Sequence, residues 1–224
     1  MHKRVSTGIA KLDQMLGGGL PIGAIVTVIG CPGSGKTLLA AKFIYEGAAT
    51  YGETGVYVCL TEPKDVFIST MKSYGWDFEE LVDRGFVEVL DLSIGTELES
   101  QSAFNKIAAA LSKVSAKRLA IDSLTALNIG LKDDVSRRHL IRILYRVLKK
   151  TNCTSLLILE TPLNYNSFGS MMEEFIADGI IHLNQYYNDD GTLTRTLRVF
   201  KMRGTSHEIK IRKYIITDKG VEIL

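Results

Sequence analysis

Residues 30–37 read Gly-Cys-Pro-Gly-Ser-Gly-Lys-Thr and match the phosphate-binding pattern G-x-x-x-x-G-K-T at every fixed position. The apolar, largely β-branched run 24–29 before this loop predicts a buried strand, and the run 38–45 after it, rich in helix formers, predicts a helix. A strand, a glycine-rich loop and a helix start in this order present backbone N–H groups and a positive dipole end to an anion. The sequence therefore predicts that this loop binds a nucleoside triphosphate.

The loop also supplies the two side chains that such a site needs. A lysine at position 36 reaches the β- and γ-phosphates, and the hydroxyl of a threonine at position 37 binds Mg²⁺. The residues of this region that we expect to contact the nucleotide are Gly30, Pro32, Gly33, Ser34, Gly35, Lys36, Thr37 and Leu38.

Length and composition favour one large α/β core, and we expect a single domain over residues 1–224. No apolar run approaches the ~18 residues that cross a bilayer, and the N-terminus lacks the apolar core of a signal peptide. Three widely spaced cysteines fit a reducing compartment rather than a disulfide framework. We therefore expect a cytoplasmic protein without membrane contact. A net charge of +2 does not mark an obligate nucleic-acid binder.

The order of apolar runs defines the fold class. Strand-like and helical runs alternate, which favours a mostly parallel sheet covered by helices on both faces. From about residue 180 the pattern becomes antiparallel, because the runs 180–183 and 194–202 flank the turn signal Asn-Asp-Asp-Gly at 188–191. The other predicted strands are 25–30, 56–61, 86–91, 118–122, 155–160, 208–216 and 221–223, and the predicted helices are 36–50, 64–74, 101–113 and 136–150.

Three acidic residues at strand ends are candidates for the chemistry of hydrolysis. Asp122 closes the strand 118–122, where a second acid holds the water shell of the metal, although an aspartate there can instead cap a helix. A further carboxylate must orient or deprotonate the attacking water. Glu62 is our preferred base, because we expect its strand to lie beside the strand of the phosphate loop, and Glu160 is the alternative.

Lys201 and Arg203 are candidates for stabilising charge on the γ-phosphate. Side chains at i and i+2 of an extended strand share a face, so these two cations point the same way. Such cations accelerate phosphoryl transfer by roughly 10³–10⁵. A solvated pair on a sheet edge has the same spacing. The spacing leaves both readings open, and it does not say whether the cations act within their own subunit.

Together these motifs resemble those of the RecA-type ATPases, and in particular the KaiC family of archaeal and bacterial proteins, over nearly the whole chain. The sharpest match is Phe-Lys-Met-Arg-Gly-Thr-Ser-His at 200–207, followed by Tyr-Ile-Ile-Thr-Asp-Lys-Gly at 214–220. The resemblance implies a RecA-like fold, slow Mg²⁺-dependent ATP hydrolysis, and a homo-oligomeric, hexameric ring with ATP or ADP between protomers. It implies that Lys201, Met202, Arg203, Thr205 and His207 reach the ATP of the neighbouring subunit, that Thr217 and Asp218 border that nucleotide, and that Ser73 lies near the adenosine.

Two departures from the family pattern bear on activity. The family usually carries two successive glutamates where this chain reads Thr61-Glu62, while the related RadA recombinases carry a single one. Residues 169–178 resemble the ATP-hydrolysing half of KaiC, and Glu174-Phe175 stand where the other half has its phosphorylated Ser-Thr pair. Slow hydrolysis with Glu62 as base is therefore expected, and autokinase activity is not.

Three functions remain in competition at the level of sequence. The first is an oligomeric ATPase whose nucleotide state alters subunit packing or the binding of a protein partner. The second is a RadA-like protein that binds DNA, but residues 161–178 contain no Lys or Arg, and the stretch after the fourth strand offers only Lys132, Arg137 and Arg138. The third is a signalling scaffold in which ATP holds subunits together with little turnover, consistent with Thr61.

Overall fold

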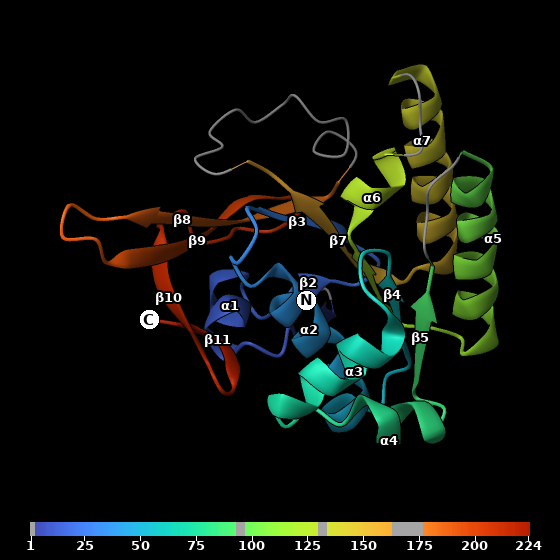
Figure 1. Ribbon diagram of the computed structural model, residues 1–224, viewed down its shortest axis with the longest axis horizontal. Coiled ribbons are helices and arrows are strands. Elements are labelled where there is room, and N and C mark those ends of the chain that lie inside the picture. Colours follow the sequence, from blue (N-terminus) through green and yellow to red (C-terminus); the bar gives the residue numbers. More distant parts are fainter. Residues whose placement is uncertain (1–2, 93–96, 130–133, 163–176) are drawn as a thin grey trace.

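The computed structural model describes residues 3–92, 97–129, 134–162 and 177–224. Within these residues, nine strands form one sheet in the order β11-β10-β9-β8-β3-β7-β6-β4-β5, and β1 (Arg4–Val5) pairs with β2 (Leu20–Pro21) beside it (Figure 1). The strands of the large sheet are β3 (Ile25–Gly30), β4 (Gly55–Cys59), β5 (Val87–Asp91), β6 (Arg118–Asp122), β7 (Thr154–Glu160), β8 (Gly179–Tyr187), β9 (Leu193–Met202), β10 (Arg212–Thr217) and β11 (Gly220–Ile223).

The six strands from β8 to β5 run parallel, and β9, β10 and β11 add antiparallel pairs at one edge. The predicted α/β class with antiparallel C-terminal strands is confirmed. The predicted antiparallel pairing of the runs 180–183 and 194–202 is also confirmed, since β8 pairs with β9 in this way, while its other neighbour, β3, lies parallel to it. The continuous apolar run at the start of β8 reflects this central position, in which both faces are buried.

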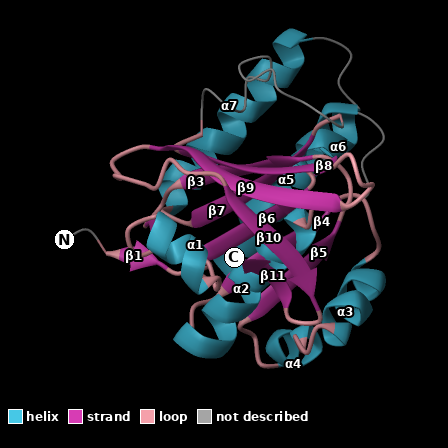
Figure 2. Cartoon of the chain, turned by 90° about the vertical axis from the view of Figure 1, so that its left-hand side faces the viewer, coloured by secondary structure: helices cyan, strands magenta, loops and turns pink. Residues whose placement is uncertain are grey.

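The sheet has an apolar core on each face. Side chains alternate along β3, so that Val26 and Val28 join the cluster under one layer of helices while Ile25 and Ile29 join the other. Figure 2 shows the two layers, with α6 and α7 on one side of the sheet and α2, α3 and α4 on the other. The helices are α1 (Ala10–Met15), α2 (Lys36–Tyr51), α3 (Lys64–Ser73), α4 (Phe78–Asp83), α5 (Glu97–Lys113), α6 (Leu124–Ile129) and α7 (Asp134–Thr151).

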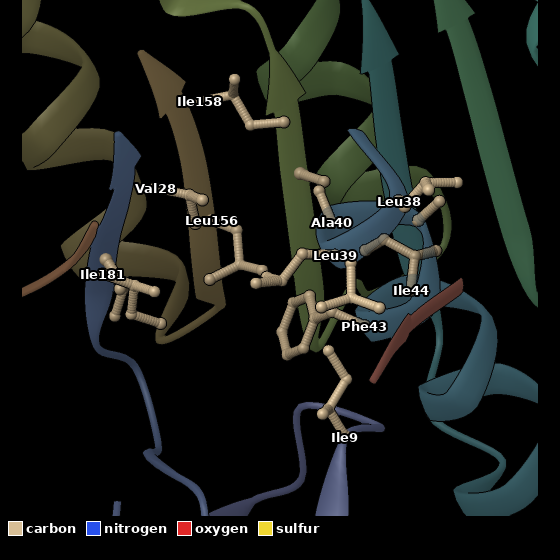
Figure 3. Packing of buried hydrophobic residues seen from close by; sticks show 14 of the residues in the cluster. Ile9, Val28, Leu38, Leu39, Ala40, Phe43, Ile44, Leu156, Ile158 and Ile181 are labelled. Atoms are coloured by element: carbon tan, nitrogen blue, oxygen red, sulfur yellow. The ribbon is translucent and has the colours of Figure 1, made fainter. Parts of the chain in front are cut away.

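Helix α2 packs closely against the sheet, with nine of its 16 residues buried. Leu39 and Phe43 are fully buried and face the sheet, where Leu156 of β7 lies close to them (Figure 3). Burying an apolar side chain of this size contributes about 1.5–3 kcal/mol. This packing fixes the start of α2, and with it the phosphate loop, against the carboxyl end of β3.

The sequence analysis missed the short helices and misplaced the start of one strand. The six-residue helices α1, α4 and α6 were missed, because fewer than two turns give no readable 3.6-residue period. The strand predicted over 208–216 begins only at Arg212, since the chain first turns toward α1, where the Glu208 N–H donates to the Met15 carbonyl oxygen at 2.8 Å. Among the described helices, none combines the length and the apolar character needed to cross a membrane.

A buried arginine ties the first residues of the chain to the sheet. Arg118 of β6 is 1% exposed, and its Nε lies 2.7 Å from a Glu53 carboxylate oxygen. Its Nη1 donates to the carbonyl oxygens of Ser6 at 2.7 Å and Phe43 at 2.8 Å, and its guanidinium lies 4.7 Å from the Phe43 ring centroid. Removing one member of such a buried set leaves the remaining polar groups without hydrogen-bond partners, which lowers stability.

We expect Arg118→Met to lower the free energy of unfolding by about 3–5 kcal/mol, because the two carbonyls and the Glu53 carboxylate lose their donor. Urea titration followed by the fluorescence of Trp76, the only tryptophan in the sequence, measures this change. The control is Lys113→Met, which breaks an exposed pair with Glu88 and should cost no more than about 1 kcal/mol. Equal losses in the two variants would contradict the assigned role.

Candidate functional site

The phosphate loop follows β3 directly and ends in the first turn of α2. Gly35 has a φ of 85° and precedes the helix, a left-handed conformation that glycine adopts without strain. Gly30 must also be glycine, since a Cβ there would come within 2.7 Å of the Ser34 hydroxyl. The two glycines thus lie where the backbone turns between β3 and α2.

Neighbouring strands hold the loop in shape. The Tyr214 hydroxyl of β10 donates to the Ser34 carbonyl oxygen at 2.6 Å, and the Gln185 side chain of β8 donates to the Pro32 carbonyl oxygen at 3.0 Å. Within the loop, the Ser34 hydroxyl donates to the Cys31 carbonyl oxygen at 2.8 Å. These bonds fix the shape of the loop, although the Ser34 N–H also donates to the Cys31 carbonyl oxygen at 3.3 Å.

Lys36 is buried at 6% exposure, and its ammonium donates to the Cys31 carbonyl oxygen at 2.9 Å. Burial lowers the pKa of Lys36, while the nearby charges of Glu160 and Asp122 act in the opposite direction. A buried ammonium with so few donors engaged gains from an anionic ligand. The position of Lys36 therefore fits the role that the motif predicts.

Thr37 and Asp122 meet at the base of the loop. The Thr37 hydroxyl donates to a carboxylate oxygen of Asp122 at 2.6 Å, and the same oxygen accepts a hydrogen bond from the Tyr57 hydroxyl at 2.9 Å. Burial and the Asp122 charge raise the pKa of Tyr57, so this phenol remains a donor. The Asp122 carboxylate therefore has partners in Thr37 and Tyr57, and its position does not require the alternative role of a helix cap.

The donor set at this point suits a hard cation. Thr37 and Asp122 offer only oxygen ligands, which Mg²⁺ prefers. Across the described part of the chain, no three His, Cys, Asp or Glu residues gather as a self-sufficient metal site. A cation here would thus depend on phosphate and water oxygens for most of its coordination, as Mg²⁺ does in nucleotide sites.

An open pocket of about 350 Å³ lies over the loop, within the usual size range of small-molecule sites. Tyr74, after α3, and Ile216, of β10, lie on its wall together with Lys36 and Asp122. Neither Tyr74 nor Ile216 was predicted as a contact, although Ser73, which was, precedes Tyr74. Ser73 itself is exposed and donates to the Thr70 carbonyl oxygen. Apolar and aromatic walls of this kind are typical of pockets that hold a base or ring.

The expected position of Glu62 beside the loop strand is wrong. Strand β4, which leads to Glu62, is separated from β3 by β6 and β7, whereas Glu160 lies directly opposite Gly30 and lines the pocket. The half-buried Glu62 nevertheless stands close enough to Asp122 to feel its charge: burial, with a further contribution from Asp122, raises the pKa of Glu62. The structure thus leaves both carboxylates near the site, on opposite sides of Asp122.

Lys201 and Arg203 lie far from their own phosphate loop. Lys201 pairs with Ile180 toward the amino end of the parallel strands, and Arg203 follows in the turn after β9. The loop is at the opposite, carboxyl end of β3, roughly 17 Å away at the usual rise per residue. The two cations therefore do not reach a phosphate bound to their own subunit.

The segment around these cations is held by the N-terminal part of the chain. The Arg4 guanidinium donates to the Thr205 hydroxyl at 2.7 Å, and the His207 ring lies 3.1 Å from the Glu208 carbonyl oxygen. Met202 is 5% exposed, and a Cβ added at Gly179 would collide with its side chain. Any nucleotide contact at Met202 thus falls to its backbone.

Thr217 and Asp218 lie at the end of β10, close to the pocket over the phosphate loop and away from Lys201. They follow Ile216, which lines the pocket of their own chain, and they form the turn to β11. The Thr217 hydroxyl donates to a Glu222 carboxylate oxygen at 2.6 Å, and Asp218 is exposed. They thus follow a residue of the chain's own pocket, and their expected place beside the neighbouring subunit's nucleotide stays a prediction.

Some predicted features lie outside the described residues. These are Lys132 and the segment 163–176, which includes Glu174 and Phe175, and the side chain of Arg137 is likewise not described. Tyr57 and Tyr214 contact Asp122 and the phosphate loop, and sequence reasoning missed both. Their polar ends meet partners 65 and 180 positions away in the chain, which leaves no local signal.

Comparison with known proteins places this geometry in context. A family model described as "ATPase: KaiC" matches residues 5–224. A UPF0273 protein of Methanopyrus kandleri is 37% identical over 99% of the chain and 92% of its own length. The circadian clock oscillator protein KaiC of Parathermosynechococcus lividus is 33% identical over 97% of the chain, which covers 41% of that protein. The crystal structure of a KaiC-like protein from Pyrococcus horikoshii superposes with a TM-score of 0.90 at 33% identity, covering all of both chains.

Proposed function

The chain belongs to the KaiC family of ATPases, and from that premise we propose that it binds ATP with Mg²⁺ and hydrolyses it slowly at the interface between subunits of a homo-oligomeric ring. The observation that carries the proposal is the convergence of Lys36, Thr37 and Asp122 on one pocket at the start of α2. A single-domain chain of this kind would act through nucleotide-dependent changes in subunit packing or partner binding.

The residues of the pocket divide the work of binding. Backbone N–H groups of the loop and the Lys36 ammonium would hold the phosphates, while Tyr74 and Ile216 would flank the rest of the nucleotide. Thr37 and Asp122 would hold Mg²⁺ directly or through water, and the metal, when bound, neutralises charge that builds on the transferring phosphoryl group. The Tyr57 hydroxyl fixes the orientation of the Asp122 carboxylate.

Hydrolysis needs charge stabilisation on the far side of the γ-phosphate. Lys201 and Arg203 cannot supply this charge within one chain. They lie level with the amino end of β3, whereas the phosphate loop follows its carboxyl end. In a ring, the same residues would face the nucleotide of the adjacent subunit and act as fingers in trans. The ring is proposed on this ground, and a hexamer is the size implied by the family.

Glu62 is the proposed base. Its raised pKa brings it nearer to the working pH, which favours proton transfer from water. Glu160 instead faces Lys36 and supports the charged form of that ammonium. A scaffold with little turnover is the second candidate, favoured by Thr61 in the position of the family's usual first glutamate.

We expect Lys36→Ala to abolish measurable ATP binding, since the only buried ammonium at the described part of the pocket is lost. Isothermal titration calorimetry with Mg²⁺-ATP tests this. Lys42→Ala, six residues further along α2 and paired with Glu46, is the matched control and should keep wild-type affinity. If Lys36→Ala still releases heat on binding Mg²⁺-ATP, the phosphates do not bind at the proposed position.

For the base, we expect Glu62→Gln to lower kcat by roughly 10²–10⁴. Glu62 must be deprotonated to accept a proton, so the wild-type rate rises as pH increases through its raised pKa, and this acidic limb should vanish in Glu62→Gln. Phosphate release measured from pH 5 to pH 9 (about two units either side of neutrality) records the profile. Glu160→Gln should keep the limb. The reverse pattern would transfer the role to Glu160.

A further inference from the structure

The two cations proposed to act in trans are held by two consecutive residues just before β8. The Lys201 ammonium donates to the Ala177 carbonyl oxygen at 2.8 Å. The backbone N–H of Arg203 donates to the Asp178 carbonyl oxygen at 2.8 Å, and Arg203 Nη1 lies 3.8 Å from Asp178 Oδ1. Both cations therefore take their position from one short segment.

The Asp178 carboxylate is itself firmly anchored. Its side chain is 15% exposed, and Oδ2 accepts hydrogen bonds from the Ile25 N–H at 2.9 Å and from the Lys149 ammonium at 2.6 Å. The same ammonium donates to the Gly23 carbonyl oxygen at 3.2 Å. Asp178 is thus fixed to the first residue of β3 and to the last turn of α7.

The two oxygens of this carboxylate make different contacts. Oδ2 takes both anchors, whereas Oδ1 faces a guanidinium that is 53% exposed and lies beyond direct hydrogen-bond distance. A long, exposed ion pair contributes little to stability, of the order of 1 kcal/mol or less. It can orient a flexible arginine and still yield it to a stronger anion such as a phosphate.

We propose that Asp178 is a positioning residue that aims Arg203 at the nucleotide of the adjacent subunit. The inference rests on the proposed trans arrangement and adds to it the residue that sets the finger's direction. An anchored carboxylate beside the finger pre-orders the guanidinium, which lowers the entropy lost when it meets the γ-phosphate. Because Asp178 lies at the opposite end of β3 from the phosphate loop, it does not contribute to nucleotide binding in its own subunit.

A secondary effect of Asp178 supports this role. Burial and the Arg203 charge lower the pKa of Lys201, and the Asp178 carboxylate opposes that shift. The Asp178 carboxylate therefore favours the charged form of Lys201. In the proposal, the carboxylate orients Arg203 and stabilises the positive charge of Lys201.

The test is a double-mutant cycle on the assembled, full-length protein. We expect Asp178→Asn to lower kcat for ATP hydrolysis on the order of tenfold, as a small misplacement of a catalytic group does, with KM for ATP unchanged. In an Arg203→Ala background, the same substitution should lower kcat no further, because its effect passes through Arg203. Glu88→Gln, which neutralises an exposed ion pair, is the matched control with wild-type kcat.

Each outcome has a separate meaning. Wild-type kcat in Asp178→Asn, or an equal fold-loss with and without Arg203, overturns the positioning role. Wild-type kcat in Arg203→Ala overturns the trans finger itself. If Asp178→Asn does not assemble, Asp178→Glu keeps the charge on a longer arm: reduced kcat at unchanged KM, absent in the Arg203→Ala background, supports the role, and unreduced kcat contradicts it.

Discussion

The pairing of β3 with parallel neighbours on both sides is the constraint on which the site depends. Its carboxyl end carries the phosphate loop, with Glu160 of β7 directly opposite Gly30. Its amino end accepts Asp178, which precedes β8 and faces Arg203. One six-residue strand therefore separates the groups that bind a triphosphate from the cations that would stabilise its hydrolysis. In the proposed function, a single subunit therefore carries both halves of the chemistry at opposite ends of this strand.

Local patterns predicted the loop, the main strands and the long helices, because each depends on residues close in sequence. The order of strands across the sheet was not predictable in this way. Glu62 was placed beside the loop strand on the assumption that consecutive strands pair, but β6 and β7 come between them. The contact of Tyr214 in β10 with the loop of its own chain was likewise not predictable, since only the folded sheet brings the two together.

Residues that support the site were harder to find than those that form it. Tyr57 reads as an ordinary strand residue, and only the tertiary structure places its hydroxyl on the Asp122 carboxylate. Asp178 sits at the end of an acidic, cation-free stretch that suggested no ligand. Its proposed role rests on contacts with a backbone N–H of β3, an ammonium of α7 and a guanidinium after β9, three elements distant in sequence. Motifs report the groups that meet the substrate, whereas orientation is a property of the assembled fold.

The central claim is that phosphate loop and cations act from different subunits, and mixing two inactive variants tests it most directly. Lys36→Ala keeps the cations without the loop, and Arg203→Ala keeps the loop without the finger. Phosphate release is measured for each variant alone and after mixed oligomers form in Mg²⁺-ATP. We predict that the mixture hydrolyses ATP faster than the sum of its components, because some interfaces join an intact loop to an intact finger. Mixed oligomers with no gain over that sum would contradict a site shared between subunits.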